Sequence, residues 1–166
     1  MKFFLALNVF LICFSAWAQE DRACNCCSED HLAFDFWIGN WEVSNARGVA
    51  AGKSSIVREE RGCVIREKWT SVKLGYTGTS LNFYNGITKQ WEQLWVDNAG
   101  TFLKLKGNRV GDSMILSSDE FVKDGKNYKN RITWTRNKDG TVRQLWEVLD
   151  GDEVDTILFD GLYTRK

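Results

Sequence analysis

Turn signals divide this sequence into short segments, and no other feature limits its possible folds as much. Beyond Trp37 a turn signal follows about every 8 to 14 residues, and Asn85-Gly86 is a strong hairpin signal because both residues tolerate positive φ. The segments between the turns alternate with a period of two residues, which is typical of β-strands. Because no gap is long enough for a crossover helix, the segments must pair in order as antiparallel hairpins.

These segments predict about ten strands in an up-and-down meander. A sheet of this size tends to curl, and closing it into a barrel removes its exposed edges. The absence of proline, the 14 glycines and the eight tryptophans also favour an all-β fold. One helical turn is expected at residues 28–34, with Ser28 as its N-cap. The expected strands cover residues 37–45, 53–60, 64–72, 78–84, 90–96, 101–110, 114–122, 127–135, 141–149 and 154–164.

The N-terminal residues predict export. Lys2 precedes an apolar run at residues 3–14, and residues 16–18 (Ala-Trp-Ala) place small side chains at the two positions that signal peptidase reads. The run is shorter than the roughly 20 apolar residues that a membrane-spanning helix needs. Lipidation at Cys13 is not expected, because the residue before a lipidated cysteine is usually small and Ile12 is bulky. The expected organisation is a signal peptide at residues 1–18, a Cys-rich leader at 19–33 and a barrel domain at 34–166, in the periplasm or outside the cell.

Four cysteines remain after the predicted cleavage: Cys24, Cys26, Cys27 and Cys63. An even number in an exported protein indicates disulfides. Adjacent cysteines would form a strained bridge with each other, so we expect one of the three leader cysteines to bond to Cys63 and hold the leader down. The alternative is a soft-metal site in which His31 joins the leader thiolates. The spacing is not that of a zinc finger and an oxidising compartment favours disulfides, so we predict no metal site.

Charge and motifs argue against several classes of function. The formal charge of the chain is zero, and the predicted cleavage removes one lysine, so nothing indicates a nucleic-acid partner. No second apolar segment is long enough to cross a membrane. The only histidine, His31, lies in the leader rather than among the strands, which argues against a Ser-His-Asp triad.

Alternate residues on a strand share a face, and several of the predicted strands have one apolar and one mixed face. The apolar faces carry Leu81, Phe83, Leu94, Val96, Ile132 and Trp134. In an ordinary small barrel these would point inward. The mixed faces, however, hold six large aromatic side chains that would be costly to leave in water, so we expect the mixed faces to point inward. The resulting candidate ligand-binding residues are Trp41, Glu67, Trp69, Ser80, Asn82, Tyr84, Trp91, Gln93, Trp95, Arg131, Thr133, Gln144 and Trp146.

An interior of this kind would be walled by aromatic side chains and would carry a few directed hydrogen-bonding groups, as small-molecule sites usually do. Glu67 and Arg131 are its only plausible interior charges. We expect them to form a buried pair, although either could instead meet a charged group of a ligand.

Residues 34–41, Phe-Asp-Phe-Trp-Ile-Gly-Asn-Trp, resemble the start of lipocalin-superfamily (calycin) barrels, which carry Gly-x-Trp on the first strand. The resemblance implies a lipocalin-like β-barrel in which Trp41 closes one end and stacks under a basic residue of the last strand, as a cation–π contact. Arg165 is the expected basic residue, with Arg131 as the second candidate.

The chain is still more similar to a group of bacterial lipocalin-like domains that have no settled activity. The shared motifs are Phe-Asp-Phe-Trp-x-Gly-x-Trp, Glu-x-Trp, Ser-x-Asn-x-Tyr, Trp-x-Gln-x-Trp-x-Asp, a late Arg and Tyr-x-Arg. They stand here at residues 34–41, 67–69, 80–84, 91–97, 131 and 163–165. Nitrobindin-type haem barrels are related in shape but bind haem through a late histidine. Because no histidine follows His31, we expect no haem and no other cofactor.

Three functions fit these observations. The first is a binding protein for a small, partly apolar molecule held in the barrel. The second is an isomerase or lyase in which Glu67 acts as base while Arg131 or Tyr84 stabilises negative charge. The third is an envelope interaction protein without a ligand, which would expose a large apolar patch.

Overall fold

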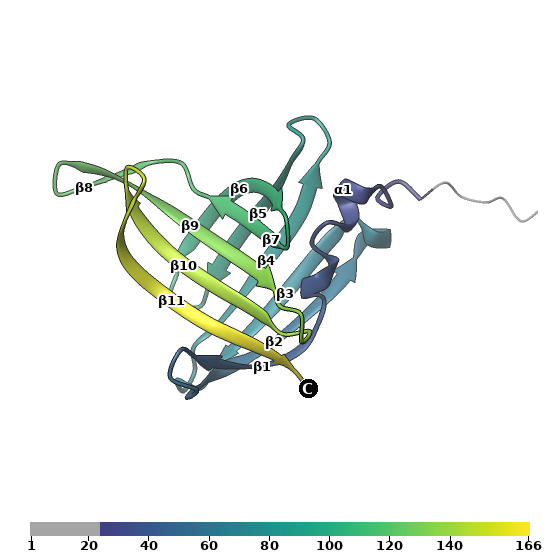
Figure 1. The fold of residues 1–166 in the computed structure, drawn as a ribbon, viewed down its shortest axis with the longest axis horizontal. Helices are drawn as coiled ribbons and strands as arrows, with labels where there is room; N and C mark the ends of the chain where they lie inside the picture. The colour runs from purple at the N-terminus through teal and green to yellow at the C-terminus, as the bar shows by residue number, and fades with distance from the viewer. Residues whose placement is uncertain (1–23) are drawn as a thin grey trace, which may run out of the picture.

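The computed structural model describes residues 24–166, so the predicted signal peptide and the first part of the leader lie outside the described residues. Figure 1 shows strands wrapped around one interior, with the helical segments gathered at one end. The helical segments are α1 (Glu29–Leu32) and the 3₁₀ turns η1 (Asp35–Trp37) and η2 (Glu60–Gly62). The strands are β1 (Gly39–Asn45), β2 (Ala50–Glu59), β3 (Val64–Ser71), β4 (Thr77–Asn85), β5 (Gln90–Asp97), β6 (Phe102–Val110), β7 (Ser113–Ser117), β8 (Phe121–Lys123), β9 (Lys126–Arg136), β10 (Val142–Asp150) and β11 (Glu153–Arg165).

The strands close into a barrel by pairing in chain order. Every pairing is antiparallel, and β11 returns to β1, where Arg165 lies opposite Trp41. Ten of the eleven strands form the closed barrel, while β8 pairs only with the beginning of β9. The predicted fold class, an antiparallel up-and-down meander closed into a β-barrel, is confirmed.

One predicted strand is divided in the structure. The segment expected at residues 114–122 forms β7 and β8, with a break at residues 118–120. At the break the Ser118 hydroxyl accepts a hydrogen bond from the backbone N–H of Asn130 at 3.0 Å. The side chain thus replaces a backbone acceptor, and the strand changes direction without leaving the β9 amide unpaired.

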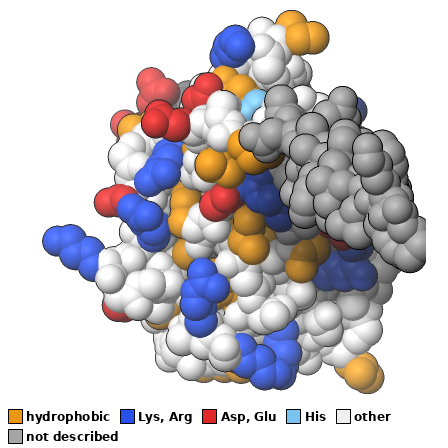
Figure 2. Space-filling view, turned by 90° about the vertical axis from the view of Figure 1, so that its right-hand side faces the viewer, with side chains coloured by type: hydrophobic (Ala, Val, Ile, Leu, Met, Phe, Trp, Pro, Cys, Tyr) orange, Lys and Arg blue, Asp and Glu red, His pale blue; other side chains and the backbone are white. Residues whose placement is uncertain are grey.

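The end of the leader and the η1 segment that follows it close one end of the barrel, which we call the plugged end; Figure 2 views the molecule from this side. Phe34 and Trp37 are fully buried there, and their rings stack with centroids 5.0 Å apart. Trp134 of β9 packs against both rings, at 5.2 Å from Phe34 and 5.3 Å from Trp37. Ser28 caps α1 by accepting a hydrogen bond from the N–H of His31, as expected. This aromatic cluster buries enough apolar surface to fix the leader in place.

Two disulfides hold the same segment. Cys26 bonds to Cys63, which lies directly before β3, and Cys24 bonds to Cys27 within the leader. The prediction that a leader cysteine bonds to Cys63 is confirmed. Because these four sulfur atoms are all in disulfides, none of them is a thiolate for the alternative metal site with His31.

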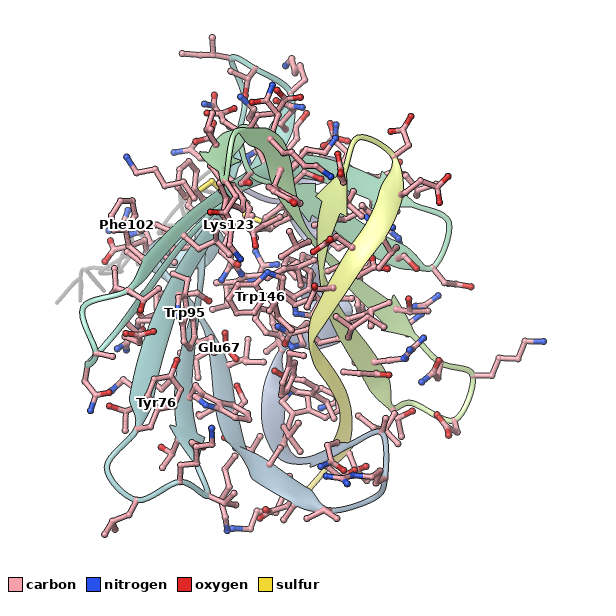
Figure 3. All side chains as sticks on the ribbon, turned by 90° about the vertical axis from the view of Figure 1, so that its left-hand side faces the viewer. Glu67, Tyr76, Trp95, Phe102, Lys123 and Trp146 are labelled. Carbon is pink, nitrogen blue, oxygen red and sulfur yellow. A yellow bond between two sulfur atoms is a disulfide. The ribbon has the colours of Figure 1, made fainter. Side chains whose placement is uncertain are left out.

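The opposite end, which we call the open end, carries the β1–β2, β3–β4, β5–β6 and β10–β11 turns, and Figure 3 looks into it. All helical segments of residues 24–166 lie at the plugged end (Figure 1). Within these residues, no helix has the length and apolar character needed to cross a bilayer.

Candidate ligand-binding site

Most of the mixed faces point into the barrel. Ser80 and Asn82 of β4 are fully buried, whereas Leu81 between them is 42% exposed, so β4 turns its polar side inward. Glu67 of β3 and Gln93 of β5 are buried beside them. The predicted residues that face the interior are Trp41, Glu67, Trp69, Ser80, Asn82, Tyr84, Trp91, Gln93, Trp95, Gln144 and Trp146.

Arg131 and Thr133 are the exceptions, and the prediction that they face inward is wrong. Strand β9 turns Ile132 and Trp134 into the barrel instead, where both are buried. Arg131 lies on the outer wall and forms an ion pair with Glu147 of β10 at 3.0 Å, and Thr133 lines the same surface pocket of about 330 Å³. The larger apolar side chains occupy the interior because their burial is worth more than that of an arginine and a threonine.

A continuous chain of hydrogen bonds crosses four strands inside the barrel. Gln93 Nε2 donates to Asn82 Oδ1 at 2.7 Å, and Asn82 Nδ2 donates to Ser80 Oγ at 3.0 Å. Ser80 Oγ donates to Glu67 Oε2 at 3.1 Å, and from the other side Ser54 Oγ donates to Glu67 Oε1 at 2.8 Å. We call these five residues the polar ladder. Each hydrogen bond between these five residues runs toward Glu67, whose carboxylate is the final acceptor, while Asn82 Nδ2 also donates to the Ile65 carbonyl at 3.0 Å.

Glu67 is a buried acid without a cationic partner among the described residues. Within residues 24–166 its carboxylate accepts hydrogen bonds only from Ser54 and Ser80, and Arg131 pairs with Glu147, so the expected pair between Glu67 and Arg131 is wrong. Burial raises the pKa of Glu67 to about 7, although the two hydroxyl donors oppose that rise. Burial, with a further contribution from the Glu67 charge, raises the pKa of Tyr163 well above its usual range.

Two inward-facing glycines allow tryptophan rings to lie along the barrel wall. A Cβ atom at Gly78 would come within 2.2 Å of the Trp95 ring, and one at Gly52 would come within 2.6 Å of the Trp69 ring. Both rings therefore cover glycine backbone on a neighbouring strand. A ring in this position lines the wall instead of extending toward the centre of the barrel.

Phe159 and Trp146 complete the aromatic lining. The Phe159 ring lies over Gly161, where a Cβ atom would approach it to 2.4 Å, and meets the Trp69 ring edge to face at 6.1 Å. Trp146 donates from Nε1 to Asn130 Oδ1 at 2.8 Å, which fixes its indole against β9. Four aromatic side chains from four strands thus surround the open half of the interior.

Three of these four aromatic side chains keep contact with solvent although they face inward, whereas Trp69 is buried. Trp95, Trp146 and Phe159 are half-buried, whereas Phe34 and Trp37 at the plugged end are fully buried. In Figure 3, Trp95, Trp146 and Glu67 point toward the interior from different strands. We use the word chamber for the part of the interior toward the open end that Trp69, Trp95, Trp146 and Phe159 border, beside the polar ladder.

Three of the predicted binding residues belong to the plugged end instead. Trp41 donates from Nε1 to the Trp37 carbonyl at 2.9 Å, and Trp91 donates from Nε1 to the Asp30 carbonyl at 2.9 Å. The Tyr84 hydroxyl donates to Asp30 Oδ2 at 3.1 Å. These contacts hold the leader on the barrel. Tyr84 and Trp91 also line a surface pocket of about 460 Å³ beside α1.

The residues expected to serve an enzyme are separated. Glu67 lies in the middle of the barrel, Arg131 on its outer wall and Tyr84 beside α1. A base and the groups that stabilise the developing negative charge must all reach one substrate. The three side chains therefore do not form a common catalytic site.

The cation–π contact expected at Trp41 is present. The guanidinium carbon of Arg165 lies 4.5 Å from the centre of the Trp41 ring. Gly39 makes this approach possible, because a Cβ atom there would lie 2.6 Å from Nη1 of Arg165. Arg165, rather than Arg131, is the basic residue in this contact.

Ser54, Asn130 and Phe159 also belong to the site, although they were not among the residues predicted from the sequence. Ser54 and Ile56 lie two residues apart on β2 and are both buried. This period of two is the sequence signal that could have identified Ser54 as an inward-facing residue. Asn130 and Phe159 lie next to an irregular pairing, at the β7–β8 break and at the bulge between β10 and β11. A bulge or break changes which side chains of a strand face inward, so the alternation of residue types no longer predicts the inward face.

A ten-stranded antiparallel up-and-down barrel is consistent with a lipocalin-like fold. No protein-family model matches the sequence, and no curated protein sequence matches it significantly. Function must therefore be inferred from the side chains of the barrel itself.

Proposed function

We propose that this chain is an exported, lipocalin-like binding protein that holds a small, partly apolar molecule in the chamber. The aromatic wall would take the apolar part of the molecule, and the polar ladder would take its hydrogen-bonding part. A site with apolar walls and a few directed polar groups is the usual form of a small-molecule site.

One observation carries this proposal: aromatic side chains face inward at the open end and still keep solvent contact. Trp95 and Trp146 are half-buried there, although large aromatic side chains gain most from complete burial. A ligand between them would complete that burial. The glycines beneath Trp95 and Trp69 support the same proposal, because they keep both rings against the wall.

Membership of the calycin superfamily and export are parts of the same proposal. The Gly-x-Trp on β1 and the Arg165 contact over Trp41 support the family. The two disulfides support an oxidising compartment, because such bonds persist mainly outside the cytosol.

Native mass spectrometry of the protein purified from its own source tests the proposed function. We expect a retained molecule that adds mass to the folded protein and is released on denaturation. The Trp95→Ala variant should lose it, while Phe102→Ala, which removes an exposed aromatic side chain outside the barrel (Figure 3), should keep it. A protein without added mass, or one that keeps the molecule in the Trp95→Ala variant, contradicts the proposal.

A further inference from the structure

The strands turn arginine side chains inward near the plugged end and acidic side chains inward toward the open end. Near the plugged end Arg58 pairs with Asp35, Arg109 lies 5.8 Å from the centre of the Phe36 ring, and Arg165 covers Trp41. Toward the open end the inward side chains include two acids. These are Glu67 of the polar ladder and Asp97, which shares a face of β5 with Trp95.

No lysine or arginine among residues 24–166 is buried. The lysines of the β8–β9 extension, Lys123 and Lys126, are exposed, and Lys126 pairs with Asp150 at 3.4 Å. Asp97 accepts a hydrogen bond from the Tyr76 hydroxyl at 3.0 Å. Glu67 therefore has no internal cation to balance its charge, and a charge buried in this way is costly unless a partner compensates it.

The Glu67 carboxylate has capacity for a further donor. Each of its oxygens accepts one hydroxyl hydrogen bond, from Ser54 or Ser80, whereas a carboxylate offers about four acceptor positions. An ammonium group is the complementary donor, because it brings both N–H groups and the missing positive charge.

The aromatic wall beside Glu67 suits the same kind of group. Trp69 is the next inward residue after Glu67 on β3, and Trp95 lies in the same cross-strand row as Glu67, with the small Ser80 between them. Across that row the Cβ atoms of Glu67 and Trp95 are about 10 Å apart, with the small, fully buried Ser80 between them. Indole faces attract cations more strongly than other aromatic side chains do.

We infer that the chamber takes a small organic cation, an amine or quaternary ammonium on an apolar body, with its nitrogen beside Glu67 and its body against Trp69 and Trp95. This inference rests on the proposed function, since it names the chemical class of the ligand for that site. An anionic ligand would be repelled by Glu67 and Asp97. A neutral ligand would leave the Glu67 charge uncompensated.

Calorimetric titration with three probes of similar size and different charge tests the inference. The probes are 2-phenylethylamine, 2-phenylethanol and 3-phenylpropionate, at about pH 8, where Glu67 is mostly ionised. We expect the amine to bind about tenfold or more tighter than either of the others, as a charge-assisted contact implies. The Glu67→Gln variant, which keeps the shape and an acceptor oxygen, should abolish that preference.

Glu147→Gln is the matched control, because Glu147 is equally buried but lies on the outer wall against Arg131. It should leave all three affinities unchanged. Equal affinities of the native protein for the three probes, or tighter binding of the carboxylate, overturn the inferred ligand class but still show a binding chamber. If no probe binds and no molecule is retained in the native mass spectrum, both the ligand class and the proposed function fail.

Discussion

Ser80 donates a hydrogen bond from its hydroxyl to the buried carboxylate of Glu67 at 3.1 Å, and this contact joins the inward faces of β3 and β4. Through it the amides of Asn82 and Gln93 are connected to the only acid in the polar ladder. The contact fixes the position of a charge that has no cation beside it, and most of the expected properties of the barrel interior follow from that charge.

Stability should fall as Glu67 ionises. Its folded-state pKa of about 7 lies above its ordinary value of 4.5, so the folded protein binds this proton more tightly than the unfolded chain. The stabilisation that the raised pKa of Glu67 gives to the folded protein is complete below pH 4.5. It is lost as the pH rises from 4.5 to about 7, and it is absent at higher pH. Its size is roughly 3 kcal/mol. Urea unfolding across this pH range should show the loss in the native protein and not in Glu67→Gln, whereas Glu147→Gln should behave like the native protein. Parallel curves for the native protein and Glu67→Gln would contradict the raised pKa.

Adding a methyl group at Gly78 should move Trp95 off the barrel wall. A Cβ atom there would approach the Trp95 ring to 2.2 Å, and overpacking of this kind costs about 1 to 3 kcal/mol. Gly86→Ala is the control, because a Cβ atom at Gly86 meets nothing within 4 Å. Chemical denaturation and tryptophan fluorescence should distinguish the two variants. Equal stability and identical spectra would show that Trp95 does not lie over Gly78.

Removing the Cys26–Cys63 disulfide should destabilise the barrel more than removing Cys24–Cys27. The first closes a loop with a sequence separation of 37 residues and the second one of only 3. Loop-closure entropy gives about 4 kcal/mol for the first and under 2 kcal/mol for the second. Paired Cys→Ser variants compared by thermal unfolding measure both effects, and the reverse order would contradict the role of Cys26–Cys63 in holding the leader.

The Arg165→Ala variant should weaken the plugged end. The guanidinium lies 4.5 Å from the centre of the Trp41 ring, and such contacts are worth about 0.5 to 2 kcal/mol. Lys166→Ala, one residue further along, removes an exposed charge without an aromatic partner and should change the free energy of unfolding by less. A comparison of the two by urea denaturation decides the point; equal effects would mean that the aromatic contact contributes nothing.

The sequence predicts the barrel well because the turns and the period of two agree along almost the whole chain. On β4 and β5 one face is clearly mixed and the other clearly apolar, and the inward direction of Ser80 and Gln93 follows. On β9 both faces carry large side chains, so alternation alone does not decide whether Arg131 or Ile132 faces inward. Pairing with β7 and β10 settles that choice in the folded protein, where Ile132 lies opposite Leu116 and Trp146.

A crystal structure of the protein purified from its own source, with any bound molecule retained, tests the binding chamber most directly. We expect electron density for a small molecule within contact distance of Trp95 and Trp146, with a polar atom of that molecule beside Glu67. An interior filled completely by the side chains of Trp69, Trp95, Trp146 and Phe159, with no room for a ligand, would contradict the account.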